Sequence, residues 1–378
     1  MPPSSTRLPW IDHVRTLAIL FVVNMHACVT YSHVGDWYVM SNHEPTLAAK
    51  IPFILWQAHL QSFFMGLLFF IAGYFAHGSL TRRGPGAFVR ERLIRLGLPA
   101  LLYMLVIHPL IVRGINPWHA DFPPVLTYYR RYLASGRFLG SSGPLWFAVA
   151  LLIFCLGLVA WRKLRPLPSE PAVSSDAPRA SAVWVFAVAL GIGSFLVRLV
   201  QPLGTNVLNL QLGYFTQYVA AFATGVAAAR HGWLLTLAGS AQARRAGWLT
   251  LFLSPVVLLT LLLRGMNVKA EDFFGGWHWQ AFGLSVWEQL AGAGLSLGLL
   301  ALFSAKLNRD STALRWLSDR SFAVYVLHAP VLVALYLVLR PLPDQPMALA
   351  LLLTLTGLIA SYALADFARR VPGLRKIL

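Results

Sequence analysis

Runs of about 20 apolar residues recur along this chain, and they limit its possible folds more than any other feature. A helix of that length crosses the roughly 30 Å hydrocarbon layer of a bilayer. Hydrophobic residues fill 57% of the 378 positions and charged residues only 12%, whereas a typical soluble domain has about 25% charged residues. The sequence therefore predicts an all-α polytopic membrane protein whose spans form one bundle.

About ten runs qualify as membrane spans. We predict them over residues 14–32, 58–77, 96–112, 146–161, 182–200, 212–229, 248–263, 281–304, 321–339 and 347–364. Together they form a single membrane domain over residues 1–378. Between the fourth and fifth spans, residues 162–181 include a stretch rich in Pro, Ser and Ala, which predicts a disordered linker.

Lys and Arg are distributed unevenly between the two sets of alternate connections. One set, which includes both chain ends, holds 22 of the 31 basic residues, and the other holds 8. Cytosolic connections carry such an excess, so we expect the linker and both termini in the cytosol. We therefore interpret the net charge of +17 as the signal that orients the protein in the membrane. The expected partner is the lipid bilayer, and we expect no binding of nucleic acid.

The first apolar run, "RTLAILFVVNMHA", joins Arg15 to His26. Eleven residues at 100° each bring both side chains to one helix face, about 16 Å apart along the axis. Arg15 then lies at the cytosolic rim and His26 near the middle of the bilayer, where an ionisable group usually faces a polar cavity. The competing interpretation is a terminal arginine and a packed histidine bonded to a neighbouring carbonyl.

A second basic segment, "RERLIRLGLP" (90–99), opens the third predicted span. Arg92 and Arg95 are three residues apart and project from one face of an α-helix. Arginine forks suit phosphate recognition because they donate bidentate hydrogen bonds. The alternative is ordinary cytosolic charge that serves topology alone.

The predicted outer connections are aromatic, as in "HVGDWYVMSNHEP" (33–45) and "FFGGWHWQAF" (273–282). One interpretation is the interfacial Trp and Tyr belt of membrane proteins. The other is a platform on which a sugar or a similar ring stacks.

Five segments resemble the membrane acyltransferase 3 family, in the order in which that family carries them. They are "LPWIDHVRTLAILFVVNMHA", "FFMGLLFFIAGYFA", "RERLIRLGLPALLY", "GPLWFAVALL" and "RSFAVYVLHAPVL". The first contains the family's arginine, ten residues and then its histidine, at Arg15 and His26. The stretch from Tyr31 through "FFIAGYFA" is most similar to the glucan biosynthesis protein C branch, which succinylates periplasmic glucans.

The resemblance implies an integral O-acyltransferase of the bacterial inner membrane. Its donor would be a cytosolic acyl-CoA-type co-substrate, and its acceptor a hydroxyl of an envelope glycan or another molecule beyond the outer face. Arg15, Arg92 and Arg95 would hold the donor's phosphates, and His26 would remove the acceptor's proton as a general base. We expect no bound cofactor and no metal. Pro144 stands where many family members have a histidine, so no role transfers to that position.

Further residues are candidates to line the site. Asp12 matches the family's opening and either pairs with Arg15 or orients the first helix; the competing interpretation is an interfacial salt bridge. Trp146 lines a tunnel or is a buried aromatic anchor. Tyr325 and His328 share a helix face, where His328 either faces the cavity or packs in the core.

Glu288 lies within the eighth predicted span. An unpaired carboxylate at that depth is costly, so we expect it to pair with Arg198 or with a histidine.

Three other functions fit parts of this pattern. A transporter or flippase for an envelope precursor also carries intramembrane charges and basic loops. A membrane b-type cytochrome would use His26 and His328 as axial haem ligands. A non-enzymatic scaffold for envelope assembly would leave His26 as a packing residue.

Overall fold

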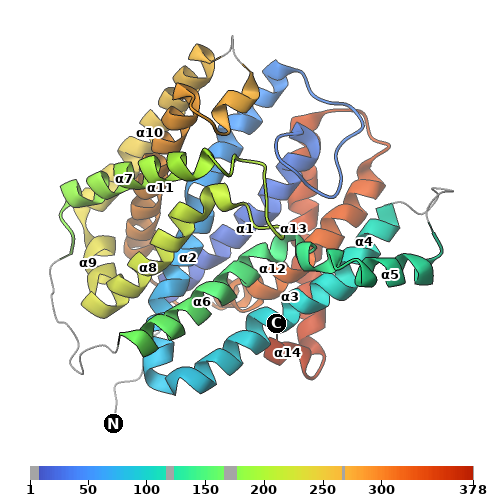
Figure 1. The fold of residues 1–378 in the computed structure, drawn as a ribbon, viewed down its shortest axis with the longest axis horizontal. Coiled ribbons are helices and arrows are strands. Elements are labelled where there is room, and N and C mark those ends of the chain that lie inside the picture. The colour runs from blue at the N-terminus through green and yellow to red at the C-terminus, as the bar shows by residue number, and fades with distance from the viewer. Residues whose placement is uncertain (1–7, 116–122, 166–176, 266–268, 378) are drawn as a thin grey trace.

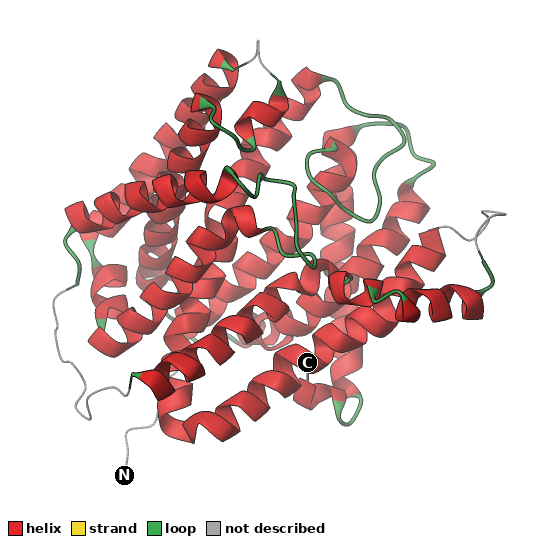
Figure 2. Ribbon diagram, in the orientation of Figure 1, coloured by secondary structure: helices red, strands yellow, loops and turns green. Residues whose placement is uncertain are grey.

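Helices form nearly all of the regular structure in the computed structural model, which describes residues 8–115, 123–165, 177–265 and 269–377 (Figure 1). Within these ranges there is no strand, and one isolated bridge joins Val207 to Leu210. Figure 2 shows helices linked by short loops, with a longer loop after the first helix. The predicted all-α fold is confirmed.

The α-helices lie in the following order along the chain: α1 (Pro9–Ser32), α2 (Leu47–Arg92), α3 (Leu98–Leu102), α4 (His108–Ile115), α5 (Val125–Ala134), α6 (Trp146–Leu164), α7 (Ala180–Arg198), α8 (Phe215–His231), α9 (Trp233–Gly239), α10 (Ala241–Arg264), α11 (Trp279–Lys306), α12 (Thr312–Leu339), α13 (Pro346–Arg370) and α14 (Leu374–Ile377). Two π-helical segments, η1 (Leu93–Gly97) and η2 (Tyr103–Ile107), interrupt the stretch between α2 and α4. The 3-10 segments are η3 (Arg137–Gly140), η4 (Gly143–Leu145), η5 (Leu212–Tyr214) and η6 (Ala270–Phe273).

Eight helical segments of the described chain are long and apolar enough to cross a membrane. One of them, Leu47–Ile115, contains both the second and the third predicted spans. The sixth predicted span corresponds to α8, whose 17 residues cover about 26 Å, slightly less than the hydrocarbon layer. Each of the predicted spans therefore has a helix, although two of them share one continuous segment.

A single backbone position divides this long segment into two arms. Gly84 has φ 75° and ψ 166° inside α2, and Pro85 follows it. A positive φ is accessible to glycine at little cost, and proline is tolerated in the first turn of the helix that restarts. In Figure 1 the chain turns within the last part of α2 and continues through α3 and α4.

Helix α1 lies in the middle of the bundle. It packs against α2, α11, α12 and α13, and Figure 1 shows it between α2 and the α12–α13 pair. Pro9 stands in its first turn, where the missing N–H breaks no intrahelical bond. These neighbours cover α1 on several sides and bury most of its residues.

The predicted linker over 162–181 is only partly described. Helix α6 ends at Leu164 and α7 begins at Ala180, while residues 166–176 lie outside the described ranges. The linker, and the side of the membrane on which the termini lie, stay predictions.

Two glycines let α2 and α8 cross in close contact. A Cβ added to Gly73 would lie 2.2 Å from the Phe222 carbonyl oxygen, and one added to Gly225 would lie 2.0 Å from the Phe70 carbonyl oxygen. Backbones that approach this closely gain packing that a larger residue would prevent.

Gly73→Ala should therefore lower the free energy of unfolding by about 1–3 kcal/mol, the usual cost of overpacking. The matched control is Gly157→Ala on α6, where an added Cβ meets nothing within 4 Å and the better helix propensity of alanine stabilises slightly. Thermal unfolding of the detergent-purified variants measures both effects. Equal stability of the two variants would contradict the close crossing.

Candidate active site

His26 lies in the last two turns of α1, with its ring against two other aromatic rings. Its centroid is 3.7 Å from that of Trp37, with 14° between the planes, and 5.3 Å from that of His328, with 16° between the planes. The His26 Nδ1 atom is buried and has no hydrogen-bond partner among the described residues. This arrangement favours a polar site over a histidine bonded through Nδ1 to a neighbouring carbonyl.

His328 reaches the same place from α12 and is fully buried. Its Nδ1 atom is 2.7 Å from the Tyr325 carbonyl oxygen. A carbonyl can only accept, so Nδ1 of the neutral ring carries the proton and Nε2 is left with a lone pair. That Nε2 atom is also buried without a partner in the described chain. The site thus contains two adjacent imidazoles, each with an unsatisfied nitrogen.

The contact between the two imidazoles bears on the cytochrome alternative. Axial ligands bind an iron that lies between them, at the centre of a porphyrin. Ring centroids only 5.3 Å apart leave no room for that macrocycle, so this arrangement of His26 and His328 does not fit a haem.

Trp37 is the residue at this site that sequence reasoning missed. It lies in the loop between α1 and α2, and its Nε1 atom is buried with no partner among the described residues. The sequence placed it in an interfacial belt or a sugar platform, but in the structure its ring covers His26. The only signal in the sequence was an aromatic residue soon after the end of the first span.

Arginines gather at the opposite end of α1. The charge of Arg15 interacts with those of Arg92 and Arg95, and the charge of Arg369 on α13 interacts with that of Arg95. Arg15 and Arg95 are exposed, with side chains 48% and 58% accessible. Four elements, α1, α2, η1 and α13, thus bring guanidinium groups to the same end of the bundle. Such a cluster favours an anionic ligand.

Acidic neighbours neutralise only part of this arginine cluster. Asp12 forms an ion pair with Arg15 at 3.5 Å. Glu91 is 3.6 Å from Arg95. Arg92 lies over the Phe88 ring at 4.9 Å, and its Nε atom is buried without a partner in the described chain.

Arg95 lies within the π-helical segment η1 and not in a regular α-helix. The sequence argument for a shared face assumed α-helical spacing. Single π turns are often found at functional sites, and no hydropathy pattern distinguishes them from α-helix.

Trp146 and Tyr325 make packing and hydrogen-bond contacts with the helices and loops around the site. Trp146 packs against Tyr218, with ring centroids 5.5 Å apart, and against Phe69, at 6.4 Å, which fits the aromatic-anchor interpretation. The Tyr325 hydroxyl donates to the Pro144 carbonyl oxygen at 2.6 Å. The position where many family members have a histidine is thus tied through its backbone to the helix that carries His328.

Glu288 on α11 forms an ion pair with Arg198 on α7, one of the two partners expected for it. Arg198 is fully buried and also donates to the Ser285 hydroxyl at 2.9 Å and to the Gly213 carbonyl at 3.1 Å. This pair joins α7 and α11 and has no ring or ion contact with His26 among the described contacts. Its geometry fits a structural role.

These features define an all-α polytopic membrane protein with two stacked histidines in its interior and an arginine cluster at one end of its central helix. Residues 8–366, nearly the whole chain, match the family described as Acyltransferase domain, the acyltransferase 3 family. The chain belongs to that family and is an acyltransferase. No curated protein and no solved structure matches it significantly.

If the Arg198–Glu288 pair is structural, Glu288→Ala should cost about 3–5 kcal/mol of folding free energy, because it leaves a buried charge without its partner. The double variant Arg198→Met with Glu288→Met should recover most of that loss. Asp310→Ala, which removes an exposed partner of Arg315, serves as the control and should cost at most about 1 kcal/mol. Chemical unfolding in detergent measures all three. A double variant as unstable as Glu288→Ala would contradict the pairing argument.

Proposed function

We propose that this protein is an integral membrane O-acyltransferase that uses a cytosolic acyl-CoA-type donor and acylates a hydroxyl of an envelope glycan or another extracytoplasmic acceptor. His26 is the general base, and Arg15, Arg92 and Arg95 bind the donor's phosphates. The observation that carries the proposal is the His26 Nδ1 atom, which is buried and has no partner within the described chain. Family membership supports the reaction class.

The donor would enter at the arginine cluster. Phosphate oxygens accept several hydrogen bonds from guanidinium groups, and Arg attracts them more specifically than Lys because its fork is planar. Arg15 and His26 share a face of α1, about 16 Å apart along the axis. A donor with its phosphates at the cluster and a long flexible arm along α1 would bring its thioester to His26.

The chemical step requires one proton transfer and one acyl exchange. His26 takes the proton from the acceptor hydroxyl as its oxygen attacks the thioester carbonyl. The carbon–sulfur bond then breaks, the new ester forms, and the leaving thiolate takes up the proton. The contacts with Trp37 and His328 orient the imidazole, and positioning of this kind lowers the barrier.

The uneven distribution of basic residues supports an orientation in which the arginine cluster faces the cytosol. The resemblance to the glucan biosynthesis branch supports a glycan acceptor on the opposite side, and the bacterial inner membrane as the location. The acyl group is selected by the space next to His26, so acetyl and succinyl donors are both to be tested.

His26→Ala should abolish acyl transfer, a loss of at least about 100-fold for removal of a general base, while the folded protein stays in the membrane. Mass spectrometry of envelope glycans and lipids from cells with the wild-type or the variant protein measures the transferred group. It also identifies the acceptor.

The matched control is His231→Ala. His231 also lies against a tryptophan, Trp233, at 4.9 Å and 15°, and its Nδ1 is likewise buried without a partner among the described residues. It should keep normal transfer. Normal transfer by His26→Ala would refute the base assignment, and no mass increment even with the wild type would favour a transporter.

Replacing both Arg92 and Arg95 with alanine should raise the apparent KM for the acyl-CoA donor about tenfold or more, with a smaller effect on turnover at saturation. The control is the pair Arg244→Ala and Arg245→Ala at the start of α10, which removes the same charge from the same predicted side. Steady-state kinetics with acetyl-CoA and succinyl-CoA distinguish them. Equal changes in both double variants would mean that Arg92 and Arg95 serve topology alone.

A further inference from the structure

A cavity of about 140 Å³ opens at the end of α1 opposite the arginine cluster. Its walls come from the end of α1, the loop that follows, the end of α12 and the short connection to α13. The side chains used below are Tyr31, Ser41, Asn42, Tyr336, Arg340 and Asp344, all of which line it. No residue of the arginine cluster or of the histidine pair is among its walls.

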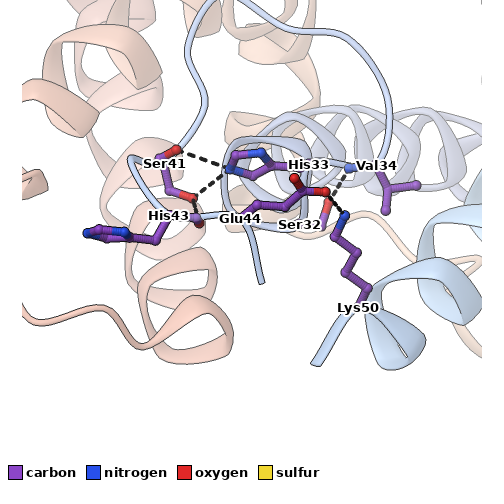
Figure 3. Close-up of polar contacts among 7 residues, drawn as sticks. All are labelled: Ser32, His33, Val34, Ser41, His43, Glu44 and Lys50. Carbon is purple, nitrogen blue, oxygen red and sulfur yellow. Dashed lines mark hydrogen bonds and ion pairs between the residues drawn. The ribbon is translucent and has the colours of Figure 1, made fainter. Parts of the chain in front are cut away.

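The wall contributed by the loop is held in place by several hydrogen bonds, some of which Figure 3 shows. His33 Nε2 lies 2.9 Å from the Ser41 hydroxyl, which in turn donates to the His43 carbonyl at 3.0 Å. The Ser41 N–H donates to the Thr30 carbonyl at 2.7 Å, one of the carbonyls that the end of α1 leaves free. The loop is therefore a fixed part of the cavity.

An ion pair between Glu44 and Lys50 closes the base of the same loop (Figure 3). The Lys50 ammonium group lowers the pKa of the Glu44 carboxyl below its ordinary value by hydrogen bonding and charge attraction. The pair joins the loop to the first turns of α2.

One polar group in the cavity wall lacks a partner. The Tyr31 side chain is only 2% exposed, and its hydroxyl has no hydrogen-bond partner among the described residues. The hydroxyl of the neighbouring Tyr336, by contrast, donates to the Met40 carbonyl at 2.7 Å. Buried polar groups are rarely left unsatisfied, so we expect the partner of the Tyr31 hydroxyl to lie in the cavity that this residue lines.

The chemistry of the walls selects an uncharged ligand rich in hydroxyl groups. The Ser41 hydroxyl donates to the His43 carbonyl, and Arg340 Nε donates to Asn42 Oδ1 at 3.2 Å. The other N–H groups of Asn42 and Arg340 can still donate to a ligand, and the Asp344 carboxylate can accept. The opposite charges of Arg340 and Asp344 balance, which disfavours a phosphate or another anion. The rings of Tyr31 and Tyr336, with centroids 6.2 Å apart, form the aromatic part of the cavity wall.

The position of the cavity along the helices relates it to the histidines. Tyr31 follows His26 by five residues on α1, about 8 Å along the axis, and Tyr336 follows His328 by eight residues on α12, about 12 Å. Both displacements exceed the width of one sugar ring. A sugar unit in the cavity is therefore not the unit whose hydroxyl reaches His26.

We propose that the cavity between Tyr31, Asn42, Tyr336 and Arg340 is a subsite for a neutral sugar unit that neighbours the acylated unit of an oligosaccharide acceptor. This inference rests on the proposed function for the identity of the acceptor. The binding of a saccharide at the cavity is a separate claim and is tested without a donor.

The test measures equilibrium binding of ligands to the purified full-length protein in detergent, without any acyl-CoA. Saturation-transfer NMR and calorimetry detect the binding. The probes are glucose, the trisaccharides cellotriose and maltotriose, and inorganic phosphate. We expect at least one trisaccharide to bind more tightly than glucose, and phosphate not to compete. Binding by no saccharide, or competition by phosphate, would overturn the proposal.

Tyr31→Phe keeps the ring and removes only the unpaired hydroxyl, so it should fold normally and weaken trisaccharide binding about 5- to 10-fold, the loss of one hydrogen bond. Arg340→Met should weaken it further. The matched control is Tyr362→Phe, since the Tyr362 hydroxyl is also buried and unpartnered in the described chain but lines a different groove. Equal binding by Tyr31→Phe and Tyr362→Phe would overturn the assignment of the cavity.

The outcomes of this test and of the His26 test are separable. Saccharide binding that depends on Tyr31 but comes with no acyl transfer would support the subsite and refute the proposed function. Acyl transfer to an envelope acceptor without such binding would support the function and refute the subsite.

Discussion

A polar atom buried in an apolar bundle needs a partner, and this constraint organises the interior of the protein. Lipid tails cannot supply one, so each unmet hydrogen bond costs free energy. The fold meets most of the requirement where charge is greatest: fully buried Arg198 is bonded to Glu288, Ser285 and the Gly213 carbonyl. The Glu288 Oε1 atom alone of this group has no partner in the described chain. Tyr325 likewise finds the Pro144 carbonyl.

Exceptions to this rule occur on several helices, and three of them lie on α1 and α12. The His26 Nδ1 and His328 Nε2 atoms at one depth, and the Tyr31 hydroxyl nearer the end of the bundle, are buried without partners in the described chain. α1 and α12 pack against each other and carry all three. These three groups therefore follow the contact between α1 and α12, and Arg15 lies toward the far end of the same α1. One central helix thus carries residues of the arginine cluster, the histidine pair and the polar cavity.

Sequence reasoning succeeded where the physical signal is local. Hydropathy over a window of about 20 residues reports whether that segment can enter a bilayer, so the helices matched the predicted spans. It missed the shared segment Leu47–Ile115 and its break at Gly84, because glycine and proline within a helical run do not reveal which way the chain turns. It also missed the π-helical turn that carries Arg95, since α and π turns have the same composition.

The sequence by itself determined the class of fold, the family, and the placement of Arg15 and His26 on one face of one helix, because helical periodicity fixes those relations without any neighbour. Only the tertiary structure decided what surrounds them. Trp37 lies against His26 because its loop folds back over the end of α1, and His328 meets His26 because α12 packs beside α1. The choice of Arg198 as the partner of Glu288 depended on the packing of α7 against α11. Such contacts join residues far apart in the chain, and no local pattern encodes them.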